Sequence, residues 1–245
     1  MGRVVTPSVW NKLSLLRLAS GLILAFGLSN LAGLLLQPAS SEEGRISPVG
    51  FLTATLILHL GGLWALSVFL REHGVRWNEF LSHPEARAGR RITLGALAGL
   101  ASIPLLGTLG SLSTWALKLL GREPQLQKPL AILESIQHPA VLILFGFTAV
   151  VTAPVFEELL FRGILFQSLD QAGWKRGAWW LSAAAFGLIH FDYEKFLPLA
   201  VFGLILTWLA VSTRTLLAPI AAHVAFNLTN FILFINRDGL EKLKP

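Results

Sequence analysis

The 245-residue chain has no cysteine, and charged side chains are scarce in it. Without cysteine it can form no disulfide, no thiolate metal site and no thiol nucleophile. Charged residues make up 14% of the sequence, against about 25% in an ordinary soluble domain. Hydrophobic residues make up 53%, and the mean hydropathy is +0.62. This balance indicates an integral, multi-pass membrane protein.

The basic residues indicate topology rather than a nucleic-acid partner, although the formal net charge is +6. They cluster in short segments between apolar runs, where lysine and arginine mark the cytoplasmic side of a membrane. Five arginines fall within 71–91, and Arg3, Lys12 and Arg17 lie near the N-terminus. We therefore expect these two segments to be cytoplasmic, the residues 37–48 to be outside, and the membrane to be the cytoplasmic (inner) membrane.

Apolar runs predict the membrane helices and give the fold class. A helix needs about 20 apolar residues to cross a bilayer. The predicted spans are 13–36, 49–70, 92–120, 139–169, 178–191, 196–211 and 216–235. The chain should therefore be an all-α, polytopic transmembrane bundle of about seven helices, with six to eight as the range.

Two local irregularities are expected within these spans. The run 139–169 is too long for one straight span, and Pro154 predicts a break in it. Gly95 and Gly99 form a G-x-x-x-G pair, which could let another helix approach closely.

Two adjacent acids and one arginine interrupt the apolar run 139–169. Each such charge costs about 2.5–3.5 kcal/mol in a bilayer on insertion scales, so each needs a partner or a use. Glu158 and Arg162 are four residues apart and can form an ion pair on one helix face. Glu157 is rotated by about 100° from Glu158, and no second cation lies near it in the sequence. We expect the ion pair to hold the helix and Glu157 to be left for function.

Two later apolar runs carry histidines at the same one-turn spacing. Phe186 precedes His190 by four residues, and His223 precedes Asn227 by four. A carboxylate such as Glu157 can act as general base on a water, an imidazole can bind a metal or hydrogen-bond that water, and an amide can donate to an oxyanion. These four polar residues would supply the parts for amide hydrolysis without a serine or cysteine nucleophile. Phe186 is interpreted as a packing or cavity-wall residue.

Other polar positions in the apolar runs are interpreted as structural. His59 is expected to be a hydrogen-bonded packing residue. Asp192, Tyr193 and Glu194 are expected to form an interfacial loop after His190.

Three motifs in this order resemble the CPBP family, the CAAX-protease and bacteriocin-processing (Abi) intramembrane endopeptidases. The resemblance covers about 139–235, which would be a catalytic core. It would follow N-terminal membrane helices and loops over 1–138 and precede a tail over 236–245. The motifs are Glu157-Glu158-x-x-x-Arg162, Phe186-x-x-x-His190 and His223-x-x-x-Asn227.

The resemblance implies a reaction, a fold and a class of substrate. Glu157 with His190 would activate water, and His223 with Asn227 would stabilise the tetrahedral oxyanion, in a membrane-embedded catalytic cavity. Glu158, Arg162 and Phe186 would support them. The substrate would be a membrane peptide or a lipidated (CAAX-type prenylated) protein in the lipid bilayer. The family's metalloprotease description implies zinc on His190 and His223, and a metal-independent glutamate mechanism fits equally well.

Two other functions stay open at this point. A proton-coupled transporter could use the same acids and histidines as a relay, although no inverted repeat with paired broken helices occurs. A non-proteolytic membrane scaffold or immunity protein could also share the fold.

Overall fold

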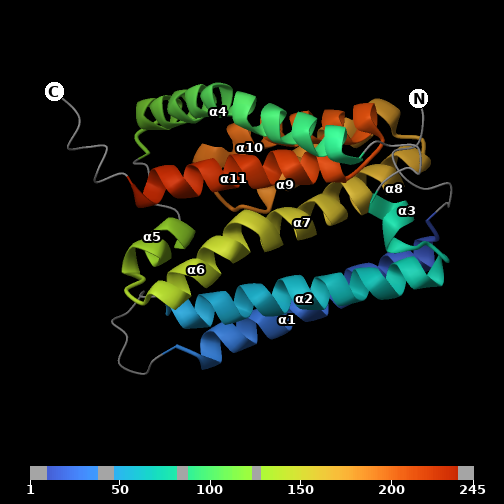
Figure 1. The fold of residues 1–245 in the computed structure, drawn as a ribbon, viewed down its shortest axis with the longest axis horizontal. Coiled ribbons are helices and arrows are strands. Elements are labelled where there is room, and N and C mark those ends of the chain that lie inside the picture. The colour runs from blue at the N-terminus through green and yellow to red at the C-terminus, as the bar shows by residue number, and fades with distance from the viewer. Residues whose placement is uncertain (1–9, 38–46, 82–87, 123–127, 237–245) are drawn as a thin grey trace. The chain divides into compact units, whose positions relative to one another are not determined.

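The computed structural model describes residues 10–37, 47–81, 88–122 and 128–236, and the elements within these ranges are all helices (Figure 1). This confirms the predicted all-α class. Within the described ranges six helices are long and apolar enough to cross a membrane, the low end of the predicted six to eight. Most of the predicted run 178–191 lies in α9 (Lys175–Leu188), which has 14 residues and is too short to count. The six are α1 (Lys12–Leu35), α2 (Pro48–Glu72), α4 (Ala88–Leu119), the continuous helix Pro139–Gln171, α10 (Tyr193–Thr213) and α11 (Leu217–Ile235).

The chain divides into two compact units, and the first comprises 7–77 and 125–156. In this unit α1 and α2 pack closely, because small residues line their contact. A Cβ atom built on Gly61 would lie 2.9 Å from the Cβ of Ala25, which is closer than real Cβ atoms approach. The unit also contains α5 (Lys128–Ser135), α6 (Pro139–Phe147) and the π-helical turn η1 (Thr148–Thr152). His59 is buried here, with its ring 5.2 Å from that of Phe156.

The second unit comprises 1–6, 78–124 and 157–245, of which the described parts include α4, α9, α10 and α11. Its core is built mainly from apolar side chains of these helices, and the fully buried ones include Phe186, Phe202 and Leu206. All the candidate site residues belong to this unit.

The predicted close approach at Gly95 and Gly99 is confirmed, and the partner is α11. A Cβ on Gly95 would lie 2.0 Å from the carbonyl oxygen of Ala218, and a Cβ on Gly99 would lie 2.1 Å from that of Ala222. Helix α4 therefore contacts the backbone of α11 directly next to His223.

The predicted break at Pro154 is wrong. The helix runs without interruption from Pro139 to Gln171, and Pro154 lies inside α7 (Ala153–Glu158). Proline removes one backbone donor and crowds the preceding turn, and here the wider π turn η1 comes directly before it. A second π segment, η2 (Leu159–Leu165), precedes α8 (Phe166–Gln171). Widened turns thus replace the expected break.

The arginine-rich segment 71–91, which falls between two predicted spans and was expected to be a polar loop, is partly helical in its described part. It contains the end of α2, the short helix α3 (Trp77–Leu81) and the start of α4. Residues 1–9, 38–46, 82–87, 123–127 and 237–245 lie outside the described ranges. The predicted orientation in the membrane stays a prediction.

Candidate active site

The most deeply buried part of the site is the pair Glu158 and Arg162, and the predicted ion pair is confirmed. Nη1 of Arg162 donates to Oε1 of Glu158 over 2.8 Å, and both side chains are fully buried. Nη2 of Arg162 donates to the backbone carbonyl of Gly203 on α10 over 2.9 Å. The guanidinium also lies over the ring of Phe186, 4.6 Å from its centroid. These contacts join the long helix to α9 and α10.

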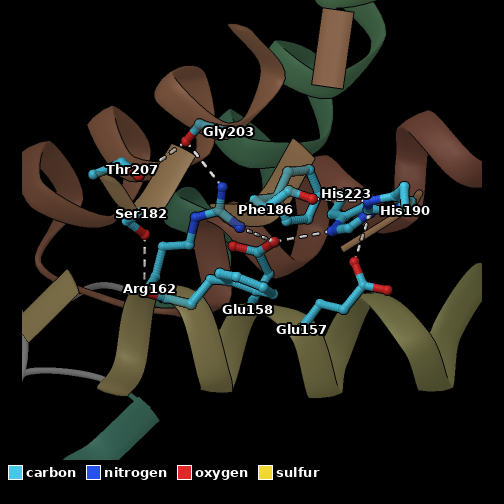
Figure 2. Close-up of polar contacts among 10 residues, drawn as sticks. Glu157, Glu158, Arg162, Ser182, Phe186, His190, Gly203, Thr207 and His223 are labelled. Carbon is cyan, nitrogen blue, oxygen red and sulfur yellow. Dashed lines mark hydrogen bonds and ion pairs between the residues drawn. The ribbon is translucent and has the colours of Figure 1, made fainter. Parts of the chain in front are cut away.

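His223 connects this buried pair to Glu157. Its Nδ1 lies 2.9 Å from Oε1 of Glu158. A carboxylate that is paired with arginine accepts hydrogen bonds and does not donate them, so Nδ1 of His223 carries the proton of this bond. The other nitrogen, Nε2, lies 3.9 Å from Oε2 of Glu157 (Figure 2). That separation is too long for a direct hydrogen bond, and one water beside the two groups could bond to both.

Glu157 is the more accessible of the two acids. Its side chain is 17% exposed, against 0% for that of Glu158. Its Oε2 has no hydrogen-bond partner among the residues that the structure describes. Figure 2 shows its carboxylate pointing toward the two imidazoles, whereas Glu158 points toward Arg162. The expected rotation between the neighbouring acids is therefore present.

His190 forms the exposed end of the site. It lies just beyond the end of α9, and its Nδ1 is 2.8 Å from the backbone carbonyl of Phe186. Because a carbonyl only accepts hydrogen bonds, Nδ1 is the donor, and Nε2 of the neutral ring is left to accept a proton. The next residue, Phe191, turns the chain with φ of 51°, a left-handed value that is uncommon for a bulky side chain.

Phe186 lies at the centre of these groups. It is fully buried, and its ring makes edge contacts with His190 and His223, with centroids 5.2 and 5.5 Å apart. With Arg162 over its face, this one ring touches three of the site's polar side chains. This position agrees with its interpretation as a packing residue.

Asn227 lies one turn beyond His223 on α11 and is half-buried. The spacing places both residues on one face of that helix. Its assigned contact with an oxyanion stays a prediction, as does the direct cooperation of Glu157 with His190.

The expected loop at Asp192, Tyr193 and Glu194 is wrong. Helix α10 begins at Tyr193, and Asp192 is its N-cap, with Oδ1 accepting from the backbone N–H groups of Glu194 and Lys195. Aspartate is a preferred N-cap residue because it satisfies these otherwise free donors. The acidic residue after His190 therefore starts a helix.

Sequence reasoning missed the residues that hold Arg162 from α10. The carbonyl of Gly203 accepts from Arg162 and also from Oγ1 of Thr207, 2.9 Å away. A Cβ on Gly203 would lie 3.0 Å from Cα of Ala183, so the glycine lets α9 and α10 pack tightly. A backbone acceptor leaves no mark in the sequence, although a glycine within an apolar helix is a weak signal of close packing.

The described residues provide no cluster of three ligands for a catalytic zinc. A catalytic zinc takes three protein ligands and a water. In the described part of the chain no group of three or more histidine, aspartate or glutamate side chains is arranged to hold a metal ion. His223 and His190 each direct Nδ1 to a protein acceptor, which leaves one nitrogen apiece. The zinc assignment to these histidines stays a prediction, and the steps proposed below pass through no metal.

Comparison with known proteins agrees with the motifs. Residues 139–229 match the model of the type II CAAX prenyl endopeptidase Rce1-like family. A search of curated proteins finds "Putative membrane peptidase YdiL" of Bacillus subtilis (strain 168), which is 27% identical over 179 residues. That alignment covers 70% of this chain and 71% of the relative. No solved structure matches the chain significantly.

The family model spans the three motifs and the helices that carry them. The described structure brings the first residue of each motif into one unit, with His223 in contact with Phe186 and Glu158. Over residues 139–229 this chain is therefore similar to the Rce1-like type II CAAX prenyl endopeptidase family.

Proposed function

We propose that the protein is an intramembrane endopeptidase that hydrolyses a peptide bond with Glu157 and His190 as the base and His223 and Asn227 as the oxyanion donors. The observation that supports this most is the gap of 3.9 Å between Oε2 of Glu157 and Nε2 of His223. A buried carboxylate oxygen without a hydrogen-bond partner among the described residues faces an imidazole there, where a water can be held.

The two acids differ in whether a cation neutralises them. Arg162 neutralises Glu158, and the second negative charge, on Glu157, has no arginine or lysine partner within the described contacts. A charge at membrane depth is costly unless it is paired or used. A carboxylate that keeps its free oxygen beside a water is suited to remove a proton from that water.

The proposed reaction adds one water across the peptide bond of the substrate. The water oxygen attacks the carbonyl carbon of the substrate, and its proton passes to Glu157, assisted by the accepting Nε2 of His190. The carbonyl oxygen becomes an oxyanion, which the amide of Asn227 and a protonated His223 stabilise by donating hydrogen bonds. The C–N bond then breaks, and the proton on Glu157 moves to the leaving amine. The second product is a carboxylic acid, which becomes a carboxylate by releasing the remaining proton of the water to solvent.

His223 can stabilise the oxyanion because Glu158 fixes the orientation of its ring through Nδ1. Nδ1 donates to Glu158, so the ring is oriented with Nε2 toward Glu157. When His223 is protonated it donates from both nitrogens, one to Glu158 and one to the oxyanion. This parallels the general role of a carboxylate that orients a catalytic imidazole.

The proposed substrates are membrane peptides or lipidated proteins of the CAAX type. The family supports peptide substrates, and the site lies on helices whose outer faces carry exposed apolar side chains, such as Leu188 and Leu228. Such a surface meets lipid, so a substrate with an apolar anchor would reach the site from the bilayer.

A cleavage assay in proteoliposomes tests the proposal. Wild type should cleave a prenylated peptide with a C-terminal CAAX sequence or an unmodified membrane peptide. Glu157→Gln should lower kcat by about 10²–10⁴-fold, the usual contribution of a general base, with thermal stability unchanged. Glu134→Gln is the control, since it makes the same chemical change at an exposed acid. Full activity of Glu157→Gln would refute the proposed chemistry.

A further inference from the structure

The short helix α3 contacts both helices that carry the buried half of the site, although it lies outside the family match. Phe80 on α3 is fully buried, while Trp77 at the start of the same helix is 37% exposed. The match to the family begins at residue 139.

The first contact of α3 is with the turn that carries Arg162. A Cβ atom built on Gly163 would lie 2.5 Å from Cζ of Phe80 and 3.2 Å from its Cε1. Only a residue without a side chain leaves room for the ring at this point. Phe80 therefore packs against the backbone one residue after Arg162, in η2.

The second contact of α3 is with the start of α11. The carbonyl oxygen of Leu81 accepts from the backbone N–H of Leu216 over 2.8 Å and from Oγ1 of Thr215 over 2.9 Å. Leu216 and Thr215 are fully buried, and α11 begins at the next residue. Because the first N–H groups of a helix have no partner within it, this carbonyl ties the beginning of the helix to α3.

We propose that Phe80 is a positioning residue of the active site. It fixes the spacing between η2, which carries Arg162, and α11, which carries His223. Glu158 binds both Arg162 and His223 through the same oxygen, at 2.8 and 2.9 Å. A shift of either helix would therefore lengthen one of these bonds and turn His223 away from Glu157.

This inference rests on the proposed function for its kinetic readout, and a double-mutant cycle tests it. Phe80→Ala should lower kcat by about 10- to 100-fold with KM little changed, since a misplacement of about 1 Å can have an effect of that size. Gly163→Ala should also lower kcat, because its methyl group meets the ring. The double variant should be more active than the product of the two single effects predicts, because the methyl group fills the space that the ring leaves.

Controls separate positioning from a loss of folding. Trp77→Ala removes an exposed aromatic side chain from the same helix and should retain kcat. Phe80→Leu keeps most of the buried volume and gives a folded variant if Phe80→Ala proves unstable. All values are taken per folded molecule. If the single effects multiply, or if activity falls only in proportion to the folded fraction, the positioning role is wrong.

A distance measurement tests the same point without activity. The chain has no cysteine, so Ala172→Cys at the end of the long helix that contains η2 and Leu228→Cys on α11, both exposed, can carry the two spin labels of an electron-spin distance experiment. Phe80→Ala or Phe80→Leu should shift or broaden the distance distribution, and Trp77→Ala should not. An unchanged distribution in both Phe80 variants would overturn the inference even if peptide cleavage is confirmed. A changed distribution would uphold it even if Glu157→Gln refutes the proposed chemistry.

Discussion

Glu157 and Glu158 are neighbours in the chain, and they differ in burial and in the partners that they bind. Glu158 is fully buried and binds Arg162 and His223. Glu157 is 17% exposed and faces His223 at 3.9 Å. A rotation of one residue along a helix thus separates a structural acid from an accessible one. Burial and pairing, rather than residue type, therefore distinguish the acid that supports the site from the acid that is proposed to react.

The largest expected effect comes from breaking the buried pair. Arg162→Met should destabilise the protein by about 3–5 kcal/mol, because it leaves the charge of Glu158 buried without its partner. Unfolding of the purified protein in detergent measures this. Arg17→Met is the control, since Arg17 and Glu72 form an ion pair of similar length, 2.9 Å, at the surface, where such pairs add little.

A second variant sharpens this prediction. Glu158→Gln combined with Arg162→Met removes both buried charges and should recover part of the stability that Arg162→Met loses. Equal effects of Arg162→Met and Arg17→Met would contradict the structural role of the buried pair.

A smaller effect is expected where α4 packs against α11. Gly99→Ala should destabilise the protein by about 1–3 kcal/mol, the usual range for overpacking, because its Cβ would meet the carbonyl of Ala222. It should also lower kcat, since Ala222 precedes His223. Unfolding and cleavage assays measure the two effects.

Gly107→Ala is the matched control on the same helix. A Cβ there meets nothing within 4 Å, and alanine favours a helix by about 0.5–1 kcal/mol over glycine. This variant should be as stable as wild type or slightly more so. Loss of stability in both variants would show that the contact with α11 is not the cause.

The smallest effect is expected at the ring that touches both parts of the site. Phe186→Leu removes the cation–π contact with Arg162, which contributes about 0.5–2 kcal/mol, and the edge contacts with both imidazoles. It keeps the carbonyl that holds His190, so kcat should fall only a few-fold. Phe147→Leu, at an exposed phenylalanine, should have no effect on cleavage. A loss as large as that of Glu157→Gln would mean that Phe186 does more than pack.

Much of the architecture could be predicted because membrane insertion imposes strong rules. Apolar length gave the spans and the all-α class, and the four-residue spacing gave the pair of Glu158 and Arg162. Small residues at Gly95 and Gly99 correctly indicated a close helix contact. In each case the signal is local in the chain, or it depends on the solvent rather than on a distant partner.

Other features depend on contacts that no local pattern encodes. The carbonyl of Gly203 that binds Arg162 belongs to a helix 41 residues later in the chain. Proline at 154 predicts a break, but the widened turns on either side accommodate it. Asp192 looked like part of a polar loop because its use as a helix cap depends on where α10 begins. The contact of Glu157 with His223 depends on the packing of two helices and could not be read from spacing.

One comparison of two variants tests the central claim most directly. Glu157→Gln and Glu158→Gln make the same chemical change at neighbouring residues, and both cleavage per folded molecule and thermal unfolding are measured for each. We expect Glu157→Gln to lower kcat by about 10²–10⁴-fold while unfolding as wild type does, and Glu158→Gln to lower both stability and activity. If Glu157→Gln cleaves normally, or if the two variants lose stability equally, the division between an accessible base and a buried support is wrong.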